Sequence, residues 1–203
     1  MFGKVASDVL GLSDIGSVIK PEDFNKVDSD DYIMHEENEK IYFLIKSKSD
    51  EYCFTNVALV HLDGTSAMSK KRTLRRLTYS RNMIHNVLLE TAGTVDLDVE
   101  IKFTMGEANY SIDVHKKHIA EIKDLYKALL KIAEIQHEND LRHRYTQQSI
   151  ETTVRTFDSV RAEVKLEDQF KAVNQYNFEW LVKAHEQYVR KDFGEIYEKF
   201  INN

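Results

Sequence analysis

Residues 97–103 read Leu97-Asp98-Val99-Glu100-Ile101-Lys102-Phe103, with apolar and charged side chains in strict alternation. A period of two places the apolar side chains on one face, which is typical of a half-buried β-strand. The preceding Thr91-Ala92-Gly93-Thr94 predicts a turn into this strand. Similar runs continue to about residue 114, where the apolar spacing becomes helical and stays so to the C-terminus. The sequence therefore predicts a small antiparallel β module capped by helices.

Seven short strands are predicted in this module, which suits a small sandwich or barrel. They span about 41–46, 51–55, 57–62, 73–79, 84–91, 97–104 and 110–114. Turn-forming residues separate several of them, as in Ser47-Lys48-Ser49-Asp50 and Asp63-Gly64. Leu74 and Leu77 cannot lie on one face of a regular strand, so we expect a bulge or a late strand start there.

Two short helical stretches are expected before the strands. Phe2–Leu12 is amphipathic, and a further helical turn opens at Pro21, where the missing N–H costs nothing. The single cysteine, Cys53, cannot form an internal disulfide and is expected to be a small residue of the core or sheet.

Three helices are predicted after the strands. The first starts at Lys117, continues for about twenty residues and would close one end of the β module. The second spans about Asn139–Val164 and the third about Leu166–Ile201. The last two would leave an apolar stripe with little to bury it. Its aromatic content favours pairing with the same hairpin of another copy, and folding back on the β module is the alternative.

The candidate oligomer interface takes one residue from the second helix and five from the third. These residues are Phe157, Phe170, Val173, Trp180, Leu181 and Tyr188. We expect Trp180 to lie in the apolar seam of the hairpin, beside Phe170, Val173, Ala184 and Tyr188.

The charges are unevenly distributed along the chain, whose net charge is −6. Residues 21–63 are rich in acids, whereas residues 70–81 hold six bases and no acid: Lys70, Lys71, Arg72, Arg75, Arg76 and Arg81. This run is a candidate edge for an anionic partner. The alternative is a solvated edge strand whose bases discourage aggregation or pair with the acidic segment of the same or a neighbouring chain.

No motif of the chain indicates catalysis or a cofactor. It contains no Gly-rich phosphate loop, no Gly-x-Ser-x-Gly and no His-Glu-x-x-His. His118 and Glu121 have metal-ligand spacing on a helix, but the sequence specifies no further ligands, so no metal is expected. No run approaches the length of a membrane span and the start does not resemble a signal peptide. We expect a cytoplasmic protein, with peripheral membrane attachment as an alternative.

Several of these stretches together resemble the bacterial pleckstrin-homology (PH) domain family. They are Phe54-Thr55-Asn56, Asp63-Gly64, the basic strand and the run from Glu90 to Asp98. The helices after about residue 138 resemble the YvbH-like oligomerisation region. The resemblance implies an α+β fold: a PH-like seven-stranded antiparallel β-sandwich or barrel capped by a C-terminal helix, then a helical hairpin. It implies a PH-like domain over residues 1–137, with its short N-terminal helix, and an oligomerisation hairpin over 138–203.

The resemblance also bears on function, since it implies neither an enzyme nor catalytic residues. Eukaryotic relatives of the fold often bind phosphoinositides through bases in the first strand-loop-strand, but Lys46–Glu51 holds two lysines and no arginine. We expect a non-catalytic homo-oligomeric scaffold that presents PH-like domains to a protein or peptide partner. The alternative is a peripheral binder of anionic membrane lipids through the Lys70–Arg81 run. Nucleic acid is not an expected partner, because the pI is about 5.8.

Overall fold

The computed structural model describes residues 15–64, 72–91, 98–157 and 166–201. Its contacts divide the chain into two compact units. We call residues 1–134 together with 191–203 the β module, and residues 135–190 the helical hairpin. The predicted helix Phe2–Leu12 lies outside the described residues.

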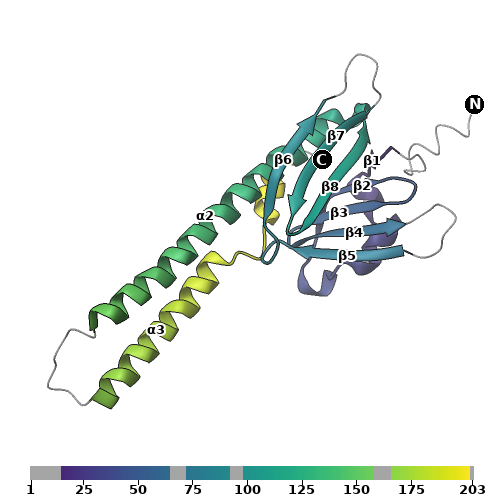
Figure 1. Ribbon diagram of the computed structural model, residues 1–203. Coiled ribbons are helices and arrows are strands. Elements are labelled where there is room, and N and C mark those ends of the chain that lie inside the picture. The colour runs from purple at the N-terminus through teal and green to yellow at the C-terminus, as the bar shows by residue number, and fades with distance from the viewer. Residues whose placement is uncertain (1–14, 65–71, 92–97, 158–165, 202–203) are drawn as a thin grey trace, which may run out of the picture. The chain divides into compact units, whose positions relative to one another are not determined.

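The β module contains two antiparallel sheets (Figure 1). The five-stranded sheet has the order β1 to β5, and the three-stranded sheet has the order β6-β7-β8. The strands are β1 (Ser17–Val18), β2 (Ile41–Lys46), β3 (Glu51–Thr55), β4 (Ala58–Gly64), β5 (Arg72–Thr78), β6 (Ile84–Glu90), β7 (Asp98–Met105) and β8 (Ala108–His115). Seven of them match the predicted strands closely, and the two-residue β1 was not predicted. The PH-like α+β architecture expected from the sequence is confirmed.

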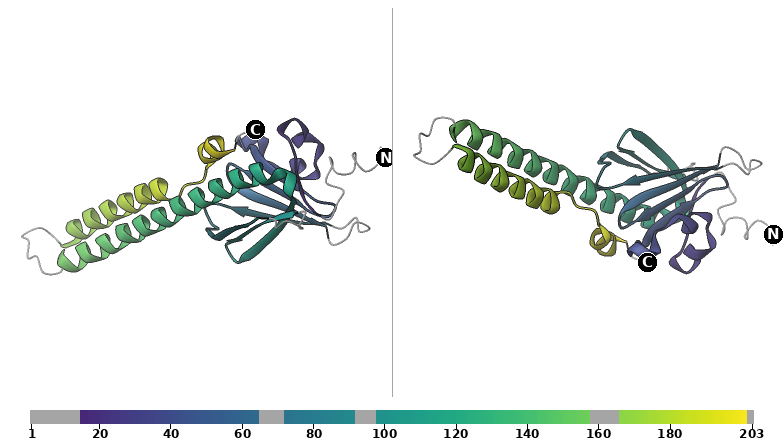
Figure 2. Two further views of the ribbon diagram at one scale, coloured as in Figure 1. Left: turned by 90° about the horizontal axis from the view of Figure 1, so that it is seen from above. Right: turned by 90° about the horizontal axis from the view of Figure 1, so that it is seen from below.

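The main core lies between the two sheets. In β7, Val99, Ile101, Phe103 and Met105 are buried and the residues between them are half-exposed, as the alternation predicted. The first turns of α2 (Ile119–Phe157) lie against the sheets and bury Ile122, Leu125, Leu129 and Ile132 (Figure 2). The predicted role of this helix in closing the module is thus confirmed.

A layer of short 3₁₀-helices covers the other face of the five-stranded sheet. They are η1 (Pro21–Lys26), η2 (Asp28–Tyr32) and η3 (His35–Glu37). Val27 and Ile33 from this layer form a second apolar cluster with Leu44, Cys53 and Val60. Cys53 is fully buried, as predicted, and burial raises the pKa of its thiol far above the usual range. A thiol in this state is a poor nucleophile.

β5 contains no bulge, which corrects the prediction made from Leu74 and Leu77. All seven residues pair in unbroken register with β4. Leu74 therefore lies on the face with the 3₁₀ layer, and Leu77 lies on the face toward the other sheet. Because this edge strand is exposed or half-buried along its whole length, its apolar residues need not share one side.

The helices differ from the prediction at two places. The first two predicted helices are one continuous helix, α2, entered through η4 (Lys116–His118). This segment contains no Gly or Pro to end it. The third predicted helix is divided into α3 (Leu166–Tyr188) and α4 (Gly194–Phe200). None of the described helices is long and apolar enough to span a bilayer.

The predicted domains, 1–137 and 138–203, remain a prediction. By its contacts, the described C-terminal stretch 191–201 groups with the β module. The chain thus leaves the β module within α2 and returns to it after α3.

Candidate binding surfaces

The basic run is divided between the two faces of β5, because successive strand residues point to opposite sides. Three of its arginines form ion pairs with acids of the same module: Arg72 with Asp28 at 2.6 Å, Arg76 with Glu39 at 2.8 Å and Arg75 with Asp63 at 3.4 Å. Arg81 is exposed in the turn after β5, and Lys70 and Lys71 lie outside the described residues. The arginines of β5 therefore do not form a row of unpaired cations.

Two buried carboxylates, Glu39 and Glu51, also contact basic side chains of this sheet, and the sequence analysis did not single them out. Glu51 is 1% exposed, accepts a 2.7 Å hydrogen bond from the Ser29 backbone N–H and contacts the Lys46 ammonium. Burial by itself favours the neutral acid, but these donors and the Lys46 charge outweigh it and hold the pKa of Glu51 below its usual value. The sequence did contain a signal for this pair: Glu51 begins one predicted strand, and Lys46 ends the preceding strand directly opposite it.

Glu39 is held in the same way at the other end of the sheet. It accepts hydrogen bonds from the Thr55 hydroxyl at 2.6 Å and the Met34 backbone N–H at 2.9 Å, in addition to Arg76. Burial opposes ionisation here too, but the Arg76 and Thr55 donors outweigh it and lower the pKa of Glu39. Both carboxylates are thus occupied in structural contacts between the 3₁₀ layer and the sheet.

A polar aromatic cluster lies on the inner face of the five-stranded sheet. Tyr52 and His61 are cross-strand partners with stacked rings 4.3 Å apart, and Tyr110 from β8 lies 5.7 Å from His61. His61 Nε2 is 3.1 Å from Asp50 Oδ1. Burial raises the pKa of Asp50, but its hydrogen bond with His61 contributes to a net lowering. The cluster joins the turn between β2 and β3 to both sheets.

The two helices of the hairpin face each other through a mixed apolar and polar stripe. On α3, Val173, Leu181 and Tyr188 are half-buried and Ala184 is buried, at spacings of a helical face. Three of the six candidate interface residues therefore lie on this inward stripe. The side chain of a fourth, Phe157, lies outside the described residues.

The remaining two candidates are exposed side chains of α3. Phe170 is 71% exposed and Trp180 is 46% exposed in the single chain. Trp180 stacks with exposed Tyr176, ring centroids 6.4 Å apart, and Phe178 is exposed as well. Trp180 lies at the edge of the stripe that carries Val173 and Ala184, and at 46% exposure it is not fully buried within one chain.

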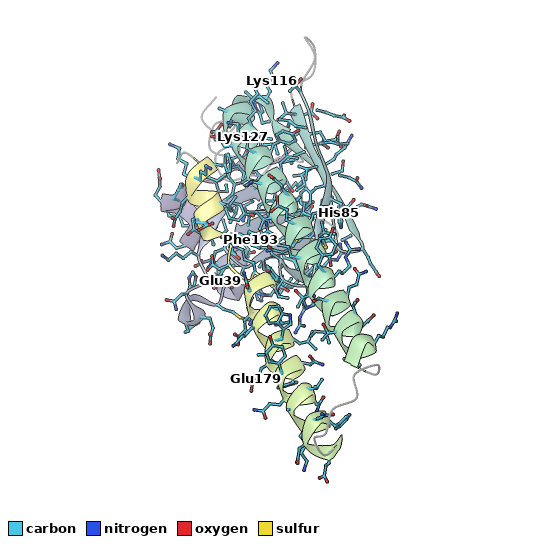
Figure 3. The ribbon with its side chains drawn as sticks, turned by 90° about the vertical axis from the view of Figure 1, so that its left-hand side faces the viewer. Glu39, His85, Lys116, Lys127, Glu179 and Phe193 are labelled. Atoms are coloured by element: carbon cyan, nitrogen blue, oxygen red, sulfur yellow. The ribbon has the colours of Figure 1, made fainter. Side chains whose placement is uncertain are left out.

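A C-terminal segment, residues 192–201, docks on the β module. Phe193 is fully buried and lies among the side chains of this module (Figure 3). Its backbone N–H donates to the Asn56 carbonyl at 2.7 Å. Tyr197 is fully buried too, and its hydroxyl is hydrogen-bonded to that of Tyr79. Sequence reasoning missed this site because the segment continues the helical spacing of α3.

The described residues contain no group of three or more His, Cys, Asp or Glu side chains that could hold a metal ion. His118 Nδ1 lies 3.3 Å from Glu121 Oε1, and burial is the main cause of the lowered pKa of His118. This pair joins the start of α2 to its own first turn.

Comparison with known proteins assigns the class of the molecule. The family model of the bacterial PH domain matches residues 9–133, and that of the YvbH-like oligomerisation region matches residues 144–203. The chain belongs to the bacterial PH domain family, as its two sheets and closing helix indicate.

Two relatives extend over nearly the whole chain. The uncharacterized protein YvbH of Bacillus subtilis (strain 168) is 56% identical over 204 residues, which cover 100% of both chains. The crystal structure of a PH domain containing bacterial protein from Exiguobacterium sibiricum 255-15 is 52% identical with a TM-score of 0.86. It covers 93% of this chain and 100% of that chain. The likeness therefore includes the hairpin region as well as the PH-like domain.

Proposed function

We propose that this protein is a non-catalytic, homo-oligomeric scaffold whose helical hairpins join copies of the chain and whose β modules bind a protein or peptide partner. The exposed aromatic side chains of α3 carry the proposal. Phe170, Tyr176, Phe178 and Trp180 are each exposed by 46% or more in the single chain. Aromatic side chains are enriched in interface cores, and these four residues belong to the matched oligomerisation region.

The buried acids support the non-catalytic part of the proposal. Glu39 and Glu51 hold arginine and lysine side chains in place and have lowered pKa values, whereas a general acid needs a raised one. PH-like domains generally serve as binding modules rather than enzymes.

The partner component rests on the edge of the five-stranded sheet. In the described part of the chain β5 has one strand neighbour, β4, so its other edge is a candidate for an added peptide strand. The alternative, lipid binding by the basic run, is less well supported. Arg72, Arg75 and Arg76 already have acidic partners within their own module.

Light scattering of the full-length chain tests self-association. We expect the wild type at a multiple of its 23.7 kDa, and a lower mass for the Tyr176→Ser/Trp180→Ser variant. The control is Tyr32→Ser, which removes an exposed aromatic side chain from the β module and should keep the wild-type mass. A wild-type mass of one chain, or an unchanged mass in the double variant, would contradict the assembly role of α3.

A further inference from the structure

The C-terminal segment is the observation that the proposed function does not use. Residues 192–201 follow α3 in sequence and lie within the matched oligomerisation region of 144–203. Their contacts, however, belong to the β module. An oligomerisation region thus ends in a segment that is recognised by a PH-like domain.

The docking surface for this segment consists of Tyr42, Asn56 and Tyr79. The ring of Phe193 meets that of Tyr79 at 5.6 Å, and the ring of Tyr197 stacks on that of Tyr42 at 5.5 Å. The two aromatic side chains are one turn apart and both fully buried. They are therefore the anchors of the segment.

Polar contacts fix the position of the segment on this surface. Asn56 Nδ2 donates to Asp192 Oδ2 at 2.6 Å, and the Tyr42 hydroxyl donates to Glu198 Oε1 at 2.9 Å. Burial and the Glu198 carboxylate raise the pKa of Tyr42 to about 12, so the hydroxyl remains a donor. A Cβ at Gly194 would come within 2.8 Å of the Tyr42 hydroxyl oxygen, so the close approach requires glycine.

The link to α3 permits another route for the chain. α3 ends at Tyr188 and α4 begins at Gly194, with no helix between them. A terminal segment beyond such a link can make the same contacts with its own β module or with that of a neighbouring copy. Whether the segment docks on its own module or on a neighbouring one depends on the link and on the local concentration of neighbouring modules. Assembly of the hairpins raises this local concentration.

We propose that residues 192–201 are an exchanged docking segment, which occupies the Tyr42–Asn56–Tyr79 surface of a neighbouring copy in the assembled protein. The partner is thus a second copy of this chain, which completes the β module with its Phe193 and Tyr197. This inference rests on the proposed self-association. It adds a second contact between copies, in which the C-terminal segment of one chain binds the β module of another.

Cysteine cross-linking between two full-length chains tests the exchange. One chain carries Asn56→Cys and the other, with a tag of different size, carries Asp192→Cys; the two are co-expressed and oxidised. A disulfide between the chains forms readily only if the segment docks across copies. We expect the mixed product in high yield. The matched control replaces Asp192→Cys with Glu186→Cys on the exposed surface of α3, which should give little product.

The double variant Asn56→Cys/Asp192→Cys provides the internal standard. If it forms an intrachain disulfide while the mixed chains form none, the segment docks within its own chain and the inference is overturned. A second pair, Tyr42→Cys with Glu198→Cys joined by a short bismaleimide, repeats the test should Asn56→Cys impair folding. Light scattering of the same samples separates the two ideas: an oligomer without mixed product refutes the exchange alone, and a single-chain mass refutes self-association.

Discussion

Besides its apolar core, the β module contains two buried carboxylates that are paired with basic side chains. Glu51 and Glu39 lie under the 3₁₀ layer, where Lys46, Arg72 and Arg76 approach them. Burying a carboxylate lowers the free energy of unfolding unless the group is paired with a cation and hydrogen-bonded. Glu39 and Glu51 each have a basic partner and a hydrogen-bond donor. The acid-rich stretch 21–63 and the basic stretch 70–81 thus pair with each other inside one module, through Arg72, Arg75 and Arg76.

Removing one partner of such a pair should be strongly destabilising. We expect Glu51→Gln to lower the free energy of unfolding by about 3–5 kcal/mol, because Lys46 loses its buried counter-charge. Glu90→Gln, at an exposed ion pair with Lys102, should change it by less than about 1 kcal/mol. Denaturant unfolding of both variants provides the comparison. Equal losses would mean that the burial of Glu51 contributes nothing.

The same acids should make the protein sensitive to low pH. The folded-state pKa values of Glu39 and Glu51 lie below the unfolded value of 4.5, so their contribution is fully present above that pH. It is lost as the pH falls through the lower folded-state values. Unfolding midpoints measured from neutral to acidic pH should decline, and the decline should be shallower in Glu39→Gln. An identical pH profile for this variant and the wild type would argue against the assignment.

Among the elements, α3 carries apolar side chains in two environments. Val173, Leu181 and Ala184 are half-buried or buried in the hairpin, whereas Phe170, Tyr176 and Trp180 are exposed to solvent in the single chain. Large exposed apolar side chains gathered on one element generally mark an interaction site. The aromatic residues predicted for the interface are thus divided between the fold of one chain and the proposed assembly.

Trp180 is the only tryptophan, so its fluorescence reports directly on the surroundings of this exposed side chain. Its emission maximum should move to shorter wavelength as the concentration rises through the assembly range, because a second copy covers the ring. Trp180→Ala should weaken association by about 2 kcal/mol, roughly 30-fold, as expected for an interface hot spot. The measurements are fluorescence and light scattering over one dilution series. An emission maximum that stays constant while the mass changes would place Trp180 outside the interface.

The whole molecule is organised around a chain that returns to its first unit. The β module is completed by residues 191–201, which follow the hairpin in sequence. Ending the chain at residue 137 would therefore remove Phe193 and Tyr197 from the β module as well as removing the hairpin. For this reason point substitutions in the full chain are the better tests of assembly.

Truncation of Phe193 should destabilise the β module. We expect Phe193→Ala to cost about 3–5 kcal/mol of unfolding free energy, since the ring is fully buried and leaves a cavity. Leu88→Ala, at a 55% exposed side chain of β6, is the matched control and should change it by less than about 0.5 kcal/mol. Chemical denaturation monitors both. A small loss for Phe193→Ala would show that the module is complete without its C-terminal segment.

The net charge and the ion pairs together predict weak binding to membranes. Vesicles with anionic headgroups should bind the protein little at low salt and less at physiological salt, where exposed charges are screened beyond about 8 Å. Arg75→Gln removes the most loosely paired arginine of β5 and should weaken any such binding further. Sedimentation with vesicles tests this. Tight, salt-resistant binding to one headgroup would instead indicate a lipid pocket.

The sequence by itself determined seven of the eight strands and the helical character of the chain after them, because local periodicity and turn residues specify both. The alternation in β7 and the helical spacing of α2 and α3 were readable without any structure, and so was the resemblance to the PH family. The tertiary structure alone decided which residues meet. The pairing of Arg72, Arg75 and Arg76 with acids depends on strand register and on the position of the 3₁₀ layer. The return of residues 191–201 depends on burial of Phe193 and Tyr197 on distant strands, which no local pattern encodes.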